Sequence, residues 1–282
     1  MLVRTRSLLL ASHPGPTATV TVLAVVLGIG IDLPVWRIVA LGIAILAGQL
    51  SIGFSNDWLD AARDRAVHRT DKPVARGDIS VTTVRTAAWV FAALTVPLSF
   101  VLGWRSAVAH LVLVASGWAY NAVLKRTAAS VVPFVLSFGL LPAVVTLASQ
   151  PPAAAAWWAL GVGGAFGVAI HFTNVLPDLD DDASTGIDGL PHRLGRVAAG
   201  VVAFVALAIA ATLVTLGPVL SGTATSPSLL GIAALVLCLA IAALGIVLVA
   251  THPPGRLLFR LIIVASLIVA ASLVLAGTSL TV

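Results

Sequence analysis

Residues 36–64 read WRIVALGIAILAGQLSIGFSNDWLDAARD, an apolar run of helical length that ends in a series of acidic residues. The part at 36–57 is long enough to cross a membrane, because a helix covers the hydrocarbon layer with about 20 mostly apolar residues. Asn56, Asp60 and Asp64 follow one another at intervals of four, so in a helix they share one face. The stretch therefore predicts a transmembrane helix whose last turns carry a polar, acidic stripe.

The composition of the whole chain supports the same interpretation. Of its 282 residues, 59% are hydrophobic and only 10% are charged, whereas soluble domains contain about 25% charged residues. So few charges cannot cover the surface of a soluble globular enzyme, and such high hydrophobicity excludes disorder. The chain contains one cysteine, Cys238, so an internal disulfide is impossible. We therefore expect an integral membrane protein.

Apolar runs separated by charged residues, proline or glycine predict nine transmembrane helices. Helices are expected because each span must satisfy its backbone hydrogen bonds internally. The fold class is thus all-α and polytopic, with one transmembrane domain over residues 1–282. A repeat of the Asn56 spacing at Asn174, Asp178 and Asp182 predicts two four-helix pseudo-repeats plus a ninth helix. The expected spans are approximately 16–34, 36–57, 81–102, 106–124, 128–149, 154–177, 196–217, 227–250 and 258–279.

Lysine and arginine predict the orientation of these spans. With a cytoplasmic N-terminus, 14 of the 16 cationic residues lie inside and only Arg37 and Arg105 lie outside, as the positive-inside rule requires. No cleavage site for a signal peptide follows the first span, so we expect that span to be retained. The prediction is a multi-pass plasma-membrane protein with its N-terminus in the cytoplasm and its C-terminus outside. The net charge of +5 then reflects orientation, and no nucleic-acid partner is expected.

Ten of the eleven acidic residues, all aspartates, lie in two clusters that this topology places on the cytoplasmic side. Crowded carboxylates at the end of a membrane helix are unfavourable unless a cation compensates them. Carboxylate and amide oxygens without histidine or cysteine suit Mg²⁺. The alternative is that the aspartates merely end a helix in a solvated loop. The candidate metal ligands are Asp57, Asp60, Asp64, Asp178 and Asp182.

Cationic residues adjoin both clusters. Arginine matches phosphate oxygens in pairs and lysine supplies a point charge, although the positive-inside rule would place cations here in any case. Together with a carboxylate-held metal, they indicate a diphosphate site. The candidate diphosphate-binding residues are Asn56, Arg69, Lys72, Arg76, Lys125, Asn174 and Arg193.

These motifs resemble those of the UbiA-type intramembrane prenyltransferases. The run from Asn56 to Asp64, followed by Arg69, Lys72-Pro73 and Arg76-Gly77, is similar to the first signature of that family. The segment 178–182, with the Leu-Pro and Leu-Gly pairs that follow, resembles the second signature, and 120–125 resembles the Tyr-and-Lys segment between them. Val175 departs from the second signature, which often has an acid at this position.

The resemblance implies Mg²⁺-dependent transfer of a polyprenyl group from a prenyl diphosphate to an aromatic or other lipid-precursor nucleophile at the cytoplasmic side. Asp60, Asp64, Asp178 and Asp182 would be the catalytic residues. The metal and the cationic residues would stabilise the charge that develops on the leaving group. The expected partners are a prenyl diphosphate donor, a hydrophobic acceptor and the lipid bilayer.

Other interpretations of the same residues remain open. A terpene cyclase or a phosphoribosyl transferase could use the same metal site, and a secondary transporter could also carry acids in its helices. Trp58, Trp118 and Tyr120 could face a carbocation, although tryptophan and tyrosine also favour membrane interfaces. His171 could act as a base on the acceptor or simply pack as a neutral side chain.

Overall fold

The protein is built of helices. A computed structural model describes residues 2–179, 186–252 and 256–281. Over these residues no strand forms, and a single isolated β-bridge joins Ala155 to Thr281. The prediction of an all-α fold is confirmed. In chain order the elements are α1 (Leu2–Ala11), α2 (Pro14–Gly30), α3 (Val35–Ala66), α4 (Pro73–Arg76), α5 (Val81–Phe100), α6 (Trp104–Ala122), η1 (Leu124–Arg126), α7 (Val132–Thr146), α8 (Trp157–Val175), η2 (Leu176–Asp178), α10 (Leu190–Leu220), α11 (Leu229–Thr251), α12 (Arg256–Leu275) and η3 (Gly277–Leu280).

Each of the nine predicted spans contains one long helix, from α2 to α12. Within the described residues, five helices are long and apolar enough to cross a membrane: α3, α5, α8, α10 and α11. The pair Thr5–Ala11 and Pro14–Gly30, bent by 67°, would make a sixth. The chain is therefore a polytopic membrane protein, whereas the count of nine crossings, the two pseudo-repeats and the single domain stay predictions.

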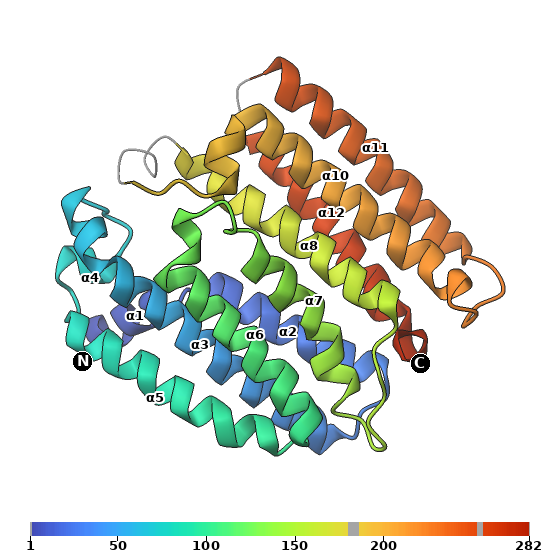
Figure 1. The fold of residues 1–282 in the computed structure, drawn as a ribbon, viewed down its shortest axis with the longest axis horizontal. Helices are drawn as coiled ribbons and strands as arrows, with labels where there is room; N and C mark the ends of the chain where they lie inside the picture. The colour runs from blue at the N-terminus through green and yellow to red at the C-terminus, as the bar shows by residue number, and fades with distance from the viewer. Residues whose placement is uncertain (1, 180–185, 253–255, 282) are drawn as a thin grey trace.

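The long helices lie side by side in one bundle (Figure 1). In one part of it α3 packs against α2, α5 and α6, and in the other α10 packs against α8, α11 and α12. Helix α7 joins the two parts, because it packs against α6 on one side and α8 on the other. Large apolar side chains on α5 and α11 remain exposed, among them Trp89, Leu94 and Val236. Continuous exposed apolar surface of this kind is typical of helices that face lipid.

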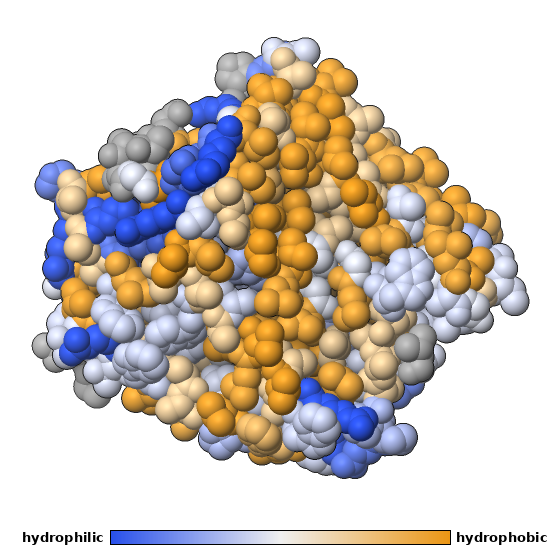
Figure 2. All heavy atoms as spheres, in the orientation of Figure 1, coloured by the Kyte–Doolittle hydropathy of each residue, from blue (hydrophilic) through white to orange (hydrophobic). Residues whose placement is uncertain are grey.

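The two motif regions lie at the same end of the bundle. The C-terminal ends of α3 and α8, the start of α10 and the short helices α1 and α4 all lie at this end (Figure 1). The backbone N–H of Leu190 donates to Ser130 Oγ at 2.9 Å, which ties the start of α10 to the segment after η1. The most hydrophilic part of the visible surface covers this end, and apolar atoms dominate most of the rest (Figure 2). We call it the polar end.

Candidate functional site

The acidic stripe of α3 is buried. α3 continues to Ala66, nine residues beyond the predicted end of the span at 57, because the charged residues end the apolar run without ending the helix. Asp57, Asp60 and Asp64 are only 1–3% exposed. Buried carboxylates require compensating charge or hydrogen bonds, so their partners decide what the site can bind.

Asp57 contacts two basic side chains, a lysine and a histidine, that come from other parts of the chain. Lys72 Nζ lies 2.6 Å from Asp57 Oδ1, and His13 Nε2 lies 2.8 Å from the same oxygen. Lys72 Nζ and His13 Nε2 are themselves 3.0 Å apart. The second oxygen, Asp57 Oδ2, is buried and has no hydrogen-bond partner among the described residues. It is a buried acceptor oxygen that no described residue satisfies.

Asp60 and Asp64 share a second group of cations. Lys125, which belongs to η1, forms a short ion pair with Asp60. Arg63 lies 3.3 Å from Asp60 and 3.2 Å from Asp64. Burial lowers the pKa of Lys125 below its usual value, although the carboxylate of Asp60 acts in the opposite direction. Helix α3 and η1 thus hold a compact set of opposite charges at the polar end.

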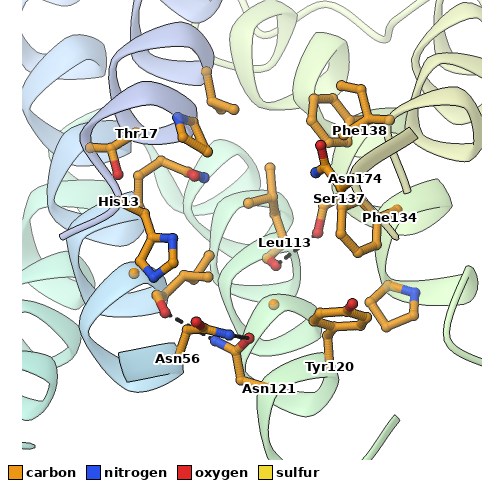
Figure 3. Close-up of a pocket in the computed structure, with 18 of the residues that line it drawn as sticks. His13, Thr17, Asn56, Leu113, Tyr120, Asn121, Phe134, Ser137, Phe138 and Asn174 are labelled. Carbon is orange, nitrogen blue, oxygen red and sulfur yellow. Dashed lines mark hydrogen bonds between the residues drawn. The ribbon is translucent and has the colours of Figure 1, made fainter. Parts of the chain in front are cut away.

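A cavity of about 220 Å³ opens beside these charges, between α2, α3, α6, α7 and α8. In Figure 3, His13 and Asn56 lie on one side of it, and Tyr120, Phe134 and Asn174 lie on the other. Asn56 donates to Asn121 at 3.2 Å and accepts from Lys72 at 3.4 Å. The remaining wall is mostly apolar and includes Val20, Leu113, Phe138, Leu141 and Ile170.

One asparagine of each predicted motif lines the cavity. Asn56 and Asn174, which hold equivalent places in the two motifs, both line it. Asp57, Asp60 and Asp64 are not among the lining residues. Asp57 is connected to the rim through Lys72, which contacts both Asp57 and Asn56. The arrangement is an apolar chamber with amide groups at its mouth and paired charges directly behind them.

Three of the predicted diphosphate-binding residues instead bind aspartates nearby in sequence. Arg69 forms two hydrogen bonds with Asp71, of 2.8 and 2.9 Å, which lower the pKa of Asp71 to about 2. Arg76 Nε donates to Asp78 at 2.8 Å, and Arg193 lies 3.0 Å from Asp188. These pairs form because each arginine shares an exposed segment with its aspartate, and the structure does not bring them into the cavity.

Most of the second aspartate cluster lies outside the described residues. This applies to Asp180, Asp181 and Asp182, and of Asp178 only the backbone is described, at the end of η2. Within the described ranges, no group of three or more His, Cys, Asp or Glu side chains is arranged to hold a metal ion. The donors present nevertheless suit Mg²⁺, because the unpaired Asp57 Oδ2 and the amide oxygens of Asn56 and Asn174 are hard oxygen ligands.

His13 is the clearest site residue that sequence reasoning missed. It lies between α1 and α2 with φ 52, a left-handed conformation uncommon outside glycine, and this bend turns its ring toward Asp57. The only available signal was its place between Ser12 and Pro14, where the first apolar stretch breaks. Gln49, Asn121 and Ser137, which also line the cavity, were missed because they are isolated polar residues in apolar runs.

The aromatic candidates divide into two groups. Tyr120 lines the cavity. Trp58 and Trp118 instead pack against each other, with ring centroids 6.3 Å apart, and are not among the lining residues. His171 is buried behind the wall, where its ring packs on Phe134 at 4.7 Å and its Nε2 lies 3.0 Å from Ser130 Oγ. These contacts favour the interpretation that His171 packs as a neutral side chain over the interpretation that it acts as a base in the cavity.

The sequence and the fold were compared with those of known proteins. The sequence matches the UbiA prenyltransferase family over residues 16–264. No curated protein matches the sequence. The fold is similar to that of a UbiA homologue from Archaeoglobus fulgidus bound to GPP and Mg²⁺, with 16% identity and a TM-score of 0.70 over 96% of this chain and 99% of that one.

Two further solved structures share the fold. One comes from work on a digeranylgeranylglyceryl phosphate synthase, with 12% identity and a TM-score of 0.68 over 98% of both chains. The other is an apo UbiA homologue from Aeropyrum pernix, with 16% identity and a TM-score of 0.67 over 89% of this chain and 96% of that one. At these identities the likeness is one of fold.

Proposed function

The chain belongs to the UbiA prenyltransferase family, and on that premise we propose that it transfers a polyprenyl group from a prenyl diphosphate to a hydrophobic acceptor, with Mg²⁺, at the cytoplasmic side of the membrane. The observation that carries the proposal is the placement of buried acid–lysine pairs directly behind the polar rim of an apolar cavity. Such a site offers opposite charges for a metal diphosphate and a dry chamber for an isoprenoid chain.

The aspartates of α3 and those after α8 are the proposed metal ligands. They are Asp57, Asp60 and Asp64, together with Asp178 and Asp182, and Asn56 and Asn174 supply neutral oxygens at the rim. When bound, Mg²⁺ would neutralise the diphosphate and stabilise the negative charge that develops as the allylic C–O bond breaks. The likeness to a homologue bound to GPP and Mg²⁺ supports this assignment.

Lys72 and Lys125 are the proposed diphosphate-binding residues nearest the cavity. Lys72 donates to Asn56, which lines the cavity. Lys125 lies behind the cavity wall, where it pairs with Asp60. Arg69, Arg76 and Arg193 lie farther out in the loops of the polar end, where they would attract the anion over a longer range. Inside the cavity, the rings of Tyr120 and Phe134 present faces that favour an allylic cation, and the apolar wall excludes water that would quench it.

The proposal is tested with membranes that contain the protein, a panel of prenyl diphosphates, candidate acceptors and Mg²⁺. We expect release of pyrophosphate, its loss on chelation of the metal, and loss of at least about a hundredfold in rate for Asp60→Asn, because removal of one electrostatic stabiliser typically costs this much. Asp178→Asn should behave in the same way. The matched control is Asp32→Asn, which removes the same charge from the exposed turn between α2 and α3.

The acceptor dependence separates the alternatives. A prenyltransferase releases pyrophosphate in proportion to the acceptor that it alkylates, whereas a terpene cyclase releases it without any acceptor. If Asp60→Asn and Asp178→Asn both keep the full rate while inserting normally, the metal assignment is wrong. If no prenyl diphosphate is turned over by the unaltered protein, the proposed function itself is wrong.

A further inference from the structure

A second apolar space lies directly beyond the cavity. It is small, about 20 Å³, and it is lined by residues of α2, α7, α8 and α12. Phe138 and Leu141 line both spaces, so they form the partition between them. The other lining residues of the inner space are Leu23, Leu27, Pro142, Val162, Gly163, Phe166, Val269, Ala270 and Leu273.

The two spaces follow one another along the same helices. On α8 the cavity is lined by Asn174 and Ile170, and the inner space by Phe166, which is eight residues before Asn174 and therefore about 12 Å farther from the polar end. On α2 the order is the same, with Val20 lining the cavity and Leu27 lining the inner space. The inner space thus continues the axis of the cavity away from the charged mouth.

The backbone that carries the partition is held in place. A Cβ on Gly163 would lie 2.1 Å from the carbonyl oxygen of Phe138, and one on Gly167 would lie 2.3 Å from that of Phe134. Helices α7 and α8 are therefore in direct backbone contact here and cannot shift apart without losing this packing. The ring of Phe138 packs edge-on against Phe166, with centroids 5.7 Å apart. The partition consists of side chains on a fixed frame.

We propose that Phe138, with Leu141 beside it, sets the length of prenyl chain that the cavity accepts. This inference rests on the proposed function. With the diphosphate at the mouth, the chain extends along the apolar wall and its end meets the Phe138 ring. The cavity volume of about 220 Å³ is below the roughly 300–1,000 Å³ of sites for drug-sized ligands. Phe138 therefore favours short donors such as geranyl diphosphate over farnesyl and geranylgeranyl diphosphates.

The test compares kcat/KM for geranyl and geranylgeranyl diphosphates in competition. Removal of the ring in Phe138→Ala joins the two spaces, so we expect the preference to shift toward the longer donor by at least about tenfold, as when hydrophobic pocket space changes by one or more methylene groups. Leu273→Ala enlarges only the inner space and should leave the ratio unchanged by itself. Combined with Phe138→Ala, it should increase the shift further.

A second variant and a second measurement distinguish a change in the pocket from misfolding of the variant. Phe138→Leu keeps an apolar side chain of moderate size and should shift the ratio in the same direction by a smaller factor. Binding of unreactive thio-diphosphate analogues of both lengths should show the same change in relative affinity. An unchanged ratio in both Phe138 variants of an active enzyme would overturn the inference, because the chain would then leave the cavity by another route. Failure of the unaltered protein to bind or turn over any donor would overturn the proposed function instead.

Discussion

Lys72 and Lys125 differ from the arginines around them in what they bind. Both lysines reach buried aspartates of α3, whereas Arg69 and Arg76 bind exposed aspartates two residues farther along the chain. An exposed pair contributes little to stability because water and salt screen it. A buried carboxylate left without its partner is strongly unfavourable. The lysine pairs therefore stabilise the folded state, and they also set the charge of the site.

The pair between Lys125 and Asp60 gives a stability prediction at this scale. Lys125→Met leaves Asp60 buried with Arg63 as its remaining cation, so the free energy of unfolding should fall by roughly 3–5 kcal/mol. The double variant Lys125→Met/Asp60→Asn should recover part of this loss, since it removes both charges. Thermal unfolding in detergent measures the change.

The matched control for that experiment is Arg76→Met. Arg76 is partly exposed and binds Asp78, so the loss should be less than about 1 kcal/mol. Equal destabilisation by Lys125→Met and Arg76→Met would contradict the assignment of Lys125 to a buried pair.

The sequence predicted the acidic face of α3 better than its partners. A spacing of four places Asn56, Asp60 and Asp64 on one side of a helix whatever the rest of the chain does. Which cation reaches each acid depends on the path of the loops and on η1, and a linear pattern does not contain that information. His13 was missed for the same reason, because its approach to Asp57 depends on the bend between α1 and α2.

At the scale of elements, α7 and α8 form the wall that gives the cavity its shape. Glycines of α8 allow the two backbones to touch, with no side chains between them at Gly163 and Gly167. Phe134 and Phe138 project from α7 into the cavity wall as a result. Loss of this contact would move both rings, so the packing of one helix pair fixes the interior of the chamber.

Two neighbouring glycines of α8 test this contact. In Gly163→Ala the new Cβ would lie 2.1 Å from the Phe138 carbonyl oxygen, so the helices must separate, and we expect lower thermal stability and lower turnover. In Gly164→Ala the nearest atom is a side-chain carbon of Val135 at 3.5 Å, an ordinary contact. That variant should be neutral or up to about 1 kcal/mol more stable, because alanine favours helix over glycine. If the two variants behave alike, the backbone contact is not tight.

The helix boundaries show where hydropathy is informative. Each predicted span contains a helix, but α3 runs on to Ala66 through charged residues, and α10 begins at Leu190 rather than at 196. Within α10, Gly195 has φ 76 and interrupts the helical geometry just where the predicted span starts. Apolar runs predict the part of a helix that contacts lipid or the core. They do not predict the helical turns that continue beyond that part.

For the whole molecule, the two ends of the bundle differ in their cationic residues. The end opposite the polar end contains Arg37, which the sequence placed outside. Arg37 is buried and donates to the carbonyl oxygens of Leu102 and Ala148, so it joins the turns after α5 and α7. This cation has a structural function at that end. The positive charges left at the polar end are the basis for the predicted cytoplasmic orientation.

Cysteine labelling tests that orientation. In a Cys238→Ala background, Thr70→Cys places a thiol in the exposed loop before α4, and Thr223→Cys places one in the exposed loop before α11. With a cytoplasmic N-terminus, a membrane-impermeant maleimide should label position 223 in intact cells and position 70 only after lysis. Labelling in the reverse pattern would show that the polar end faces outward.

The pairing of Lys72 with Asp57 and of Lys125 with Asp60 means that the site beside the cavity supplies its own counter-ions. A diphosphate that recruits either ammonium group must take it from a carboxylate, and a divalent cation that takes over the carboxylate releases the ammonium group. Anion and metal thus exchange partners with the protein and each strengthens the binding of the other by the same factor. A site built in this way discriminates against either ion alone and admits the two together.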